Sequence, residues 1–266
     1  MKFTISENVI IKKPLPAAGI VCSNPQRAQR LVNRYFPSAQ LHTDSWGIVI
    51  YTGSYQGHYM FVASVPMGAG GSGFAFLEMY AAEADYIVRY GSNDRYVTPD
   101  NLRDINIIDE VNNLYGLMRD SGLSASQWGQ SLFASPLLVD SLRHQAESLL
   151  CPVQLMICHH VEDYHAYNYP ELIGERTDNV KSLINILESS TQKNSAWDME
   201  TAALFWRATQ FKKHAVTVLQ SLIKHRGETT PYEGEYGRIA TEMEQVFGQL
   251  ILDSLVTIVS VGKVHS

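Results

Sequence analysis

The chain has 266 residues, of which 45% are hydrophobic, and its formal net charge is −6 at pH 7. This length and hydrophobic content suffice for one large core, so we expect a single domain that spans residues 1–266. The acidic balance and the lack of a run of Lys or Arg argue against nucleic acid as a partner.

The three cysteines and the apolar stretches near the two ends of the sequence indicate where in the cell the protein is expected. Cys22, Cys151 and Cys158 form no CxxC pair, which is typical of reduced thiols in a cytoplasmic protein, and Cys22 and Cys151 are expected in the core. The first residues lack the long apolar stretch of a signal peptide. The apolar run 246–264 is interrupted by polar and charged residues, so it predicts a packed helix and tail rather than a membrane span.

The first part of the chain alternates short apolar runs with helical periodicity. Its predicted elements are a strand at 17–22, a helix at 26–36, hairpin strands at 46–52 and 58–65, a glycine-rich turn at 67–73, a helix at 74–83 and a strand at 86–90. Asn24 and Pro25 favour a helix start, since Asn is a good N-cap and Pro fits the first helical position.

The second part continues the alternation. Its predicted elements are a strand at 105–108, helices at 112–121 and 137–150, a strand at 153–158, helices at 180–187 and 197–211, a strand at 214–222 and a helix at 238–259. The segment 163–178 reads as a long loop, which inside a compact domain usually has a function. The order predicts an α/β fold with a central mixed, largely parallel β-sheet flanked by helices.

The stretch Gly68-Ala-Gly70-Gly71-Ser72-Gly73 fits the pattern GxGxxG between a strand and a helix. Such glycines let backbone N–H groups approach a phosphate at the helix start. Asp94, about 20 residues further on, completes the setting of a dinucleotide site and keeps an NAD(P)-binding oxidoreductase open as an alternative. Arg89 and Ser92, however, suit an inorganic phosphate or carboxylate better than a ribose diol.

Three further clusters have both a structural and a functional interpretation. Arg27 lies in the first turn of a predicted helix, where a cation is unfavourable unless an anion lies beside it, although it fits equally as a solvated arginine on the polar face. Asp198 and Glu200 either compensate a helix dipole or bind a sugar diol. The histidines of 159–165 match no standard zinc spacing, and the sequence has no Gly-x-Ser-x-Gly elbow.

Taken together, five stretches resemble motifs of the nucleoside phosphorylase superfamily, in its purine nucleoside and uridine phosphorylase branch, over most of the chain. They are the phosphate turn at 23–28, the hairpin at 51–57, the central glycine turn at 65–71, the strand end at 87–92 and Asp198-Met199-Glu200, which is similar to the family's Glu-Met-Glu.

The resemblance implies roles for single residues. It implies phosphorolysis of a nucleoside to a free base and (deoxy)ribose 1-phosphate, with inorganic phosphate as co-substrate and neither a cofactor nor a metal. The implied catalytic residues are Arg27, Arg89 and Glu200; the phosphate-binding residues are Arg27, Gly68, Arg89 and Ser92; the sugar-binding residues are Met199 and Glu200; and the base-binding residues are Tyr164 and Arg176.

The chain departs from the family pattern near the implied phosphate. Asn24 stands where the family has Asp, Trp46 falls on the hairpin arginine that reaches a neighbouring subunit, and Asp94 replaces a glycine. A uridine-like nucleoside is favoured, because the segment between Tyr164 and Glu200 is as long as in uridine phosphorylases. The resemblance also implies a homodimer or larger homo-oligomer, and it leaves a hydrolytic nucleosidase or a catalytically silent relative as alternatives.

Overall fold

The protein is described from a computed structural model, which covers residues 10–11, 14–95, 103–112, 129–165, 194–224 and 234–262 and the single positions 124, 126, 178, 181 and 185. Its strands are β1 (Ala18–Cys22), β2 (Gln40–Ser45), β3 (Ile48–Tyr55), β4 (His58–Ser64), β5 (Tyr86–Arg95), β6 (Ile105–Asn112), β7 (Ser131–Phe133), β8 (Val153–His160), β9 (Ser195–Asp198) and β10 (His214–Lys224). Its helices are α1 (Pro25–Tyr35), α2 (Ala69–Ala81), α4 (Pro136–Ser148), α7 (Thr201–Phe211) and α8 (Gly234–Gly262).

All these strands belong to one mixed sheet with the order β2-β3-β4-β1-β5-β10-β6-β8-β9, and β7 pairs with β6. β4, β1, β5 and β10 are parallel neighbours, whereas β6 runs antiparallel to β10. Although β9 is the last strand in this order, it also contacts β5, so the sheet curls back on itself. The curl brings the end of β9 onto one face of β5.

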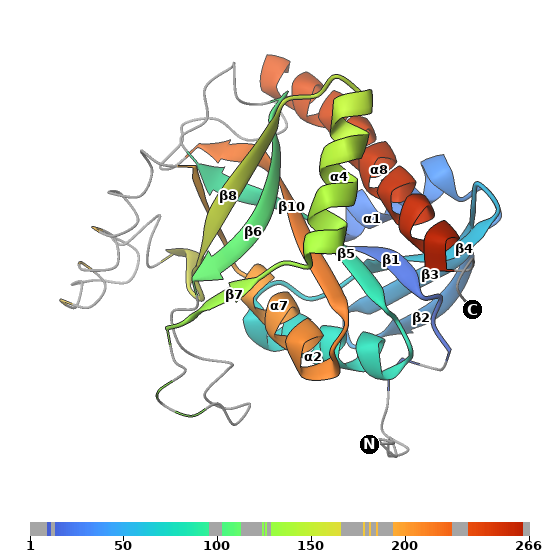
Figure 1. The fold of residues 1–266 in the computed structure, drawn as a ribbon, viewed down its shortest axis with the longest axis horizontal. Helices are drawn as coiled ribbons and strands as arrows, with labels where there is room; N and C mark the ends of the chain where they lie inside the picture. The colour runs from blue at the N-terminus through green and yellow to red at the C-terminus, as the bar shows by residue number, and fades with distance from the viewer. Residues whose placement is uncertain are drawn as a thin grey trace.

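Helices cover both faces of the sheet, as predicted for an α/β fold. α4 and α8 lie side by side over one face together with α1, and α2 and α7 lie side by side over the other (Figure 1). α1 and α8 approach each other closely at Gly248, where a Cβ atom would lie 2.6 Å from the side chain of Leu31. A glycine at this position therefore permits the packing of the two helices.

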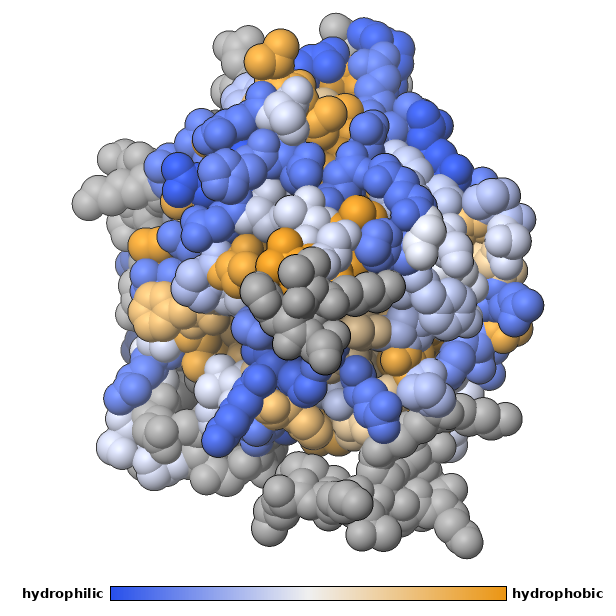
Figure 2. All heavy atoms as spheres, turned by 45° about the vertical axis from the view of Figure 1, so that its right-hand side comes forward, coloured by the Kyte–Doolittle hydropathy of each residue, from blue (hydrophilic) through white to orange (hydrophobic). Residues whose placement is uncertain are grey.

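α8 is long and apolar, and its packing explains why. Its segment Gly237–Val261 could cross a membrane by length and composition, but half of the apolar window is buried inside the fold. Buried residues such as Phe247, Leu250 and Ile251 face the sheet, in agreement with the predicted packed helix. On the face shown in Figure 2, hydrophobic atoms of the described residues come to the surface in small groups among hydrophilic ones.

The helix after the glycine-rich turn begins earlier than predicted. α2 starts at Ala69, not at Phe74, so most of the glycines lie inside the helix. The turn is confined to the residues before it, where Gly68 has φ +86° and ψ 159°, a conformation that side chains rarely allow. The backbone N–H of Gly68 is thereby left outside the helix.

The predicted helix 197–211 is wrong in its first turn. Residues 195–198 form strand β9, and α7 begins only at Thr201, so Asp198 and Glu200 precede the helix. The structural reason is tertiary: all four residues of β9 are buried and pair with β8, which outweighs the local helical pattern.

Other differences concern short strands and the ends of elements. The sequence reading missed β2 and β7, and β5, β6, β8 and β10 run longer than predicted. The predicted helix at 112–121 lies almost entirely outside the described residues, as does most of the loop at 163–178 and of the helix at 180–187.

Candidate functional site

The candidate site centres on Glu200, which follows β9 and precedes α7. One carboxylate oxygen of Glu200 accepts a hydrogen bond from the backbone N–H of Gly68 at 2.7 Å. The other oxygen pairs with Nη2 of Arg89, and both side chains are buried. Met199 lies beside them, because a Cβ atom on Gly68 would be 4.0 Å from its methyl group. Three motifs that are far apart in the sequence therefore meet at one carboxylate.

Arg89 has a second carboxylate partner, Asp198, and this pairing was not predicted from the sequence. Oδ2 of Asp198 lies 2.5 Å from Nη1 of Arg89. Asp198 also accepts hydrogen bonds from the backbone N–H of Thr201 at 3.1 Å and from the thiol of Cys158 at 3.4 Å. Arg89 thus pairs with Asp198, the last residue of β9, and with Glu200, two residues further on. Both ion pairs depend on the curl of the sheet, which brings β9 to β5.

The two groups shift each other's protonation. Burial acts to raise the pKa of the Asp198 carboxyl, but the Arg89 guanidinium and the hydrogen bonds from Thr201 outweigh it, so this pKa lies below its ordinary value. Burial acts to lower the pKa of Arg89, but Asp198 and Glu200 raise it above its ordinary value. Both groups are therefore charged at neutral pH.

Arg27 forms a second part of the site with residues of β5. Its Nη2 donates to the hydroxyl of Ser92 at 2.8 Å, and its guanidinium carbon lies 4.4 Å from the ring centroid of Tyr90. Arg27 is buried, so of its two sequence interpretations the solvated arginine on the polar face of α1 is wrong. Asn24 caps this helix as predicted, because its side chain accepts from the backbone N–H groups of Gln26 and Arg27.

Glu244 of α8 is the anion beside Arg27. Its carboxylate offsets the unfavourable position of a cation in the first turn of α1. Oε2 of Glu244 lies 3.6 Å from Nε of Arg27, and both oxygens of Glu244 bind Arg30 at 2.6 and 2.7 Å. Three arginines (Arg27, Arg30 and Arg89) thus pair with three carboxylates (Asp198, Glu200 and Glu244), so the opposite charges cancel.

Cys22, at the end of β1, links the two parts. Burial raises the pKa of the Cys22 thiol to about 12, and both Arg27 and Arg89 act to lower it. Both guanidinium groups therefore lie within electrostatic range of the same side chain, at the carboxyl end of β1 and along β5. This is the edge of a parallel sheet at which ligands of α/β proteins bind.

No family model and no curated protein matches the chain. Solved structures do match it. Uridine phosphorylase from Vibrio fischeri ES114 complexed with 6-hydroxy-1-naphthoic acid superposes with a TM-score of 0.75 at 18% identity, over 91% of this chain and 92% of that chain. Another structure of uridine phosphorylase from Vibrio fischeri ES114 gives a TM-score of 0.76 at 18% identity, over 96% of this chain and 99% of that chain.

The chain has the nucleoside phosphorylase fold. This confirms the fold that the five sequence stretches implied, and with it the α/β class with a mixed sheet. Because the identity is low, the likeness concerns the architecture and leaves the reaction to be argued from the residues.

Within this nucleoside phosphorylase fold, most predicted site residues fall into two groups, and the members of each group lie close to one another. Gly68, Arg89, Met199 and Glu200 form one group, and Arg27 and Ser92 form the other.

Of the two residues expected to contact the base, Tyr164 is described by the structure and Arg176 is not. Tyr164 follows β8 and is half-buried, four residues beyond His160, which pairs with Asp198 in the register of β8 and β9. Arg176 lies outside the described residues, and Asp94 is described by its backbone alone, in β5. Trp46 is 83% exposed in the turn between β2 and β3.

Two buried polar groups, Asn93 and His160, had no part in the site predicted from the sequence. Asn93 of β5 is fully buried, and neither its Oδ1 nor its Nδ2 has a hydrogen-bond partner among the described residues. His160, at the end of β8, is also buried and acts on the pKa of Asp198. The family motifs end before Asn93, so only its burial could have drawn attention to it.

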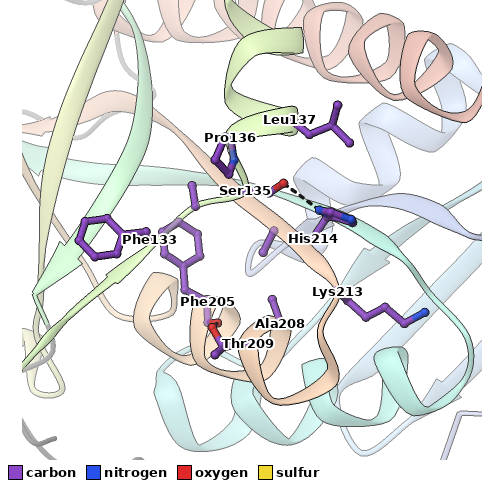
Figure 3. A pocket seen from close by; sticks show the side chains of 11 residues that line it. Phe133, Ser135, Pro136, Leu137, Phe205, Ala208, Thr209, Lys213 and His214 are labelled. Carbon is purple, nitrogen blue, oxygen red and sulfur yellow. Dashed lines mark hydrogen bonds between the residues drawn. The ribbon is translucent and has the colours of Figure 1, made fainter. Parts of the chain in front are cut away.

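Away from this site, a depression of about 340 Å³ lies at the amino end of β10. There the hydroxyl of Ser135 lies 2.8 Å from Nδ1 of His214 (Figure 3). The ring of His214 stacks on Tyr86, and the carboxylate of Asp85 pairs with Lys213. Among the described contacts no acid orients the imidazole, so this pair does not form a nucleophilic triad.

The described residues also contain no group of three or more His, Cys, Asp or Glu side chains placed to hold a metal ion. Of the histidines at 159–165, His160 has its Nε2 atom 3.8 Å from a carboxylate oxygen of Glu162, and the ring of His165 packs edge-on against Tyr164.

Proposed function

We propose that the chain is a nucleoside phosphorylase, which cleaves a uridine-like nucleoside with inorganic phosphate to give the free base and a (deoxy)ribose 1-phosphate. The observation that carries this proposal is the position of Glu200 between the N–H of Gly68 and the guanidinium of Arg89. It joins a carboxylate, a glycine turn and a strand-end arginine at the carboxyl edge of the sheet.

The chemistry of each group suits a part of such a substrate. A carboxylate has about four acceptor positions, so Glu200 can keep its two described bonds and accept hydrogen bonds from two sugar hydroxyls. Met199 offers an apolar surface to the sugar. Arg27, Ser92 and Arg89 supply donors for a phosphate, with the backbone of Gly68 nearby.

In this proposal catalysis comes from orientation and electrostatics. Phosphate attacks C1′ of the sugar while the bond from C1′ to the base nitrogen breaks, and the base leaves with that electron pair. Positive charge develops on the sugar, and an adjacent phosphate dianion stabilises it. Fixed donors on the phosphate hold it in line for attack. The chain itself therefore needs neither a cofactor nor a metal for this step.

A second candidate is a nucleosidase that uses water in place of phosphate. It is favoured by the pairing of the arginines with Asp198, Glu200 and Glu244, because the charges cancel before a phosphate arrives. A dianion then has to compete with carboxylates that already hold the guanidinium groups, and water does not.

One assay separates the candidates. We expect release of free base from uridine, tested beside inosine and adenosine, that depends on added phosphate. Release at the same rate without phosphate supports the nucleosidase. If no base is released from any of the three nucleosides with or without phosphate, the phosphorylase and the nucleosidase are both contradicted for these substrates. That result favours a catalytically silent relative. A homodimer and a cytoplasmic location remain predictions, which light scattering and cell fractionation test.

A further inference from the structure

Asn93 is a buried amide without a described partner. Its side chain is 0% exposed, and neither its amide nitrogen nor its carbonyl oxygen is hydrogen-bonded within the part of the chain that the structure describes. A buried polar group left in this state is unfavourable for folding, because it has lost its hydrogen bonds to water. Such a group is retained where a ligand or an ordered water completes it.

Asn93 lies next to the candidate site on the same strand. Side chains of a strand alternate between its faces, so Arg89, Gly91 and Asn93 of β5 share one face. The guanidinium of Arg89 extends along this face, because a Cβ atom on Gly91 would lie 2.5 Å from its Nη1. Asn93 is the next residue on that face, about 7 Å further along the strand than Gly91. Its side chain is therefore the next one on this face beyond the guanidinium that holds Glu200.

The neighbouring strands contain a matched counterexample. Asn106 of β6 is also fully buried, but its Nδ2 donates to the carbonyl of Leu219 at 2.9 Å and to the hydroxyl of Ser221 at 3.0 Å. Ser221 is the register partner of Asn93 in β10. Two buried asparagines thus lie on either side of Ser221. Among the described residues, Asn106 is hydrogen-bonded to this serine and Asn93 is not.

The chemistry of the amide restricts the group that can complete it. An amide side chain offers one acceptor and two donors, whereas a phosphate dianion offers acceptors alone and would face the carbonyl oxygen of Asn93 unfavourably. A lactam edge, in which an N–H adjoins a C=O, satisfies both ends of the amide at once. Uracil and hypoxanthine carry such an edge.

We propose that Asn93 reads the lactam edge of the substrate's base, with its Oδ1 accepting from the ring N–H and its Nδ2 donating to the adjacent carbonyl. This inference rests on the proposed function, because it assigns the base to the same site. Asn93 would then determine specificity without acting on the bond that breaks.

The test compares a lactam nucleoside with its N-methylated counterpart in the full chain. The pairs are uridine with 3-methyluridine and inosine with 1-methylinosine, because the methyl group removes the N–H. We expect the wild type to prefer the unmethylated nucleoside at least tenfold in kcat/KM. Asn93→Leu and the smaller Asn93→Ala should lower kcat/KM for the unmethylated nucleoside and reduce the preference severalfold. An unchanged preference in both variants overturns the inference while the proposed function stands.

Thermal unfolding supplies the control for a purely structural role. Asn93→Leu should leave the melting temperature unchanged or raise it, since it removes an unpaired buried amide. Asn106→Leu should lower it, because the described hydrogen bonds of Asn106 are lost. An equal fall in both variants would show that Asn93 has a structural partner and would contradict the inference. Cleavage of adenosine alone contradicts the lactam edge, and no base release from any nucleoside contradicts the proposed function and this inference with it.

Discussion

Oδ2 of Asp198 lies 2.5 Å from Nη1 of Arg89, and both side chains are buried. The pair joins the last strand of the sheet order to β5. It therefore closes the curl of the sheet and at the same time neutralises an arginine of the candidate site. Its contribution can be measured as stability and as phosphate affinity.

Asp198→Asn should lower the free energy of unfolding at pH 7 by about 1–3 kcal/mol, because a buried arginine loses one charged partner while its bond to Glu200 remains. The pKa of Asp198 is depressed in the folded state, so its stabilising effect is fully present above the unfolded pKa, about 3.9, and is lost progressively as the pH falls from there through the lower folded-state pKa. The difference between the wild type and the variant should therefore begin to shrink below about pH 4 in urea unfolding and continue to shrink as the pH falls further. A difference that is constant from pH 7 to pH 3 would contradict this assignment.

Arg89→Ala should lower kcat/KM at least tenfold, which corresponds to about 1.4 kcal/mol of transition-state stabilisation. Arg89→Lys keeps a positive charge opposite Asp198 and Glu200 but loses the forked geometry, so it should recover folding and little of the activity. Arg238→Ala is the control, because this exposed arginine pairs with Glu242 on α8. Kinetics that Arg89→Ala leaves unchanged, at both limiting and saturating phosphate, would exclude the proposed role of Arg89.

Glu244→Gln should lower the KM for phosphate severalfold. Glu244 lies 3.6 Å from Nε of Arg27 and competes electrostatically with any anion that Arg27 binds. Steady-state rates at saturating nucleoside and varied phosphate measure the effect. A raised KM would mean that Glu244 acts chiefly by positioning Arg27, and an unchanged KM would separate Arg27 from the phosphate.

The thiols should react unequally in the native protein. Burial raises the pKa of Cys22 to about 12 and that of Cys158 well above its ordinary value, so both remain protonated and inaccessible. Cys151 was expected in the core but is half-buried, and its pKa is raised less strongly by burial. A thiol reagent at pH 8 should titrate one slow cysteine in the native chain and three after denaturation. Cys151→Ser should abolish the native reaction; a fast thiol that survives this substitution would contradict the burial of the other two.

Much of the site could be predicted from the sequence because its residues belong to local motifs. Asn24 and Pro25 indicated the start of α1, and the structure places Arg27 of that helix against Ser92 of β5. The glycine turn marked Gly68 as a close backbone donor, and its partner is Glu200. In each case the residue type and its neighbours in the chain carried the signal.

The rest depends on long-range geometry. Asp198 was read as part of a helix because the segment after it has helical periodicity, whereas pairing with β8 makes it the end of a strand. Its contact with Arg89 exists only because the sheet curls until β9 reaches β5. Asn93 gave no signal in the sequence, since a single asparagine in a strand becomes notable only when its burial and its lack of partners are known.

The most direct test of the central claim is the product formed from uridine in the presence of inorganic phosphate, followed by phosphorus NMR. The proposed function predicts that a sugar 1-phosphate resonance grows in step with free uracil, and that it grows at least tenfold more slowly in Arg89→Ala at limiting substrate. Uracil released without any sugar phosphate would contradict phosphorolysis and assign the chain to hydrolysis.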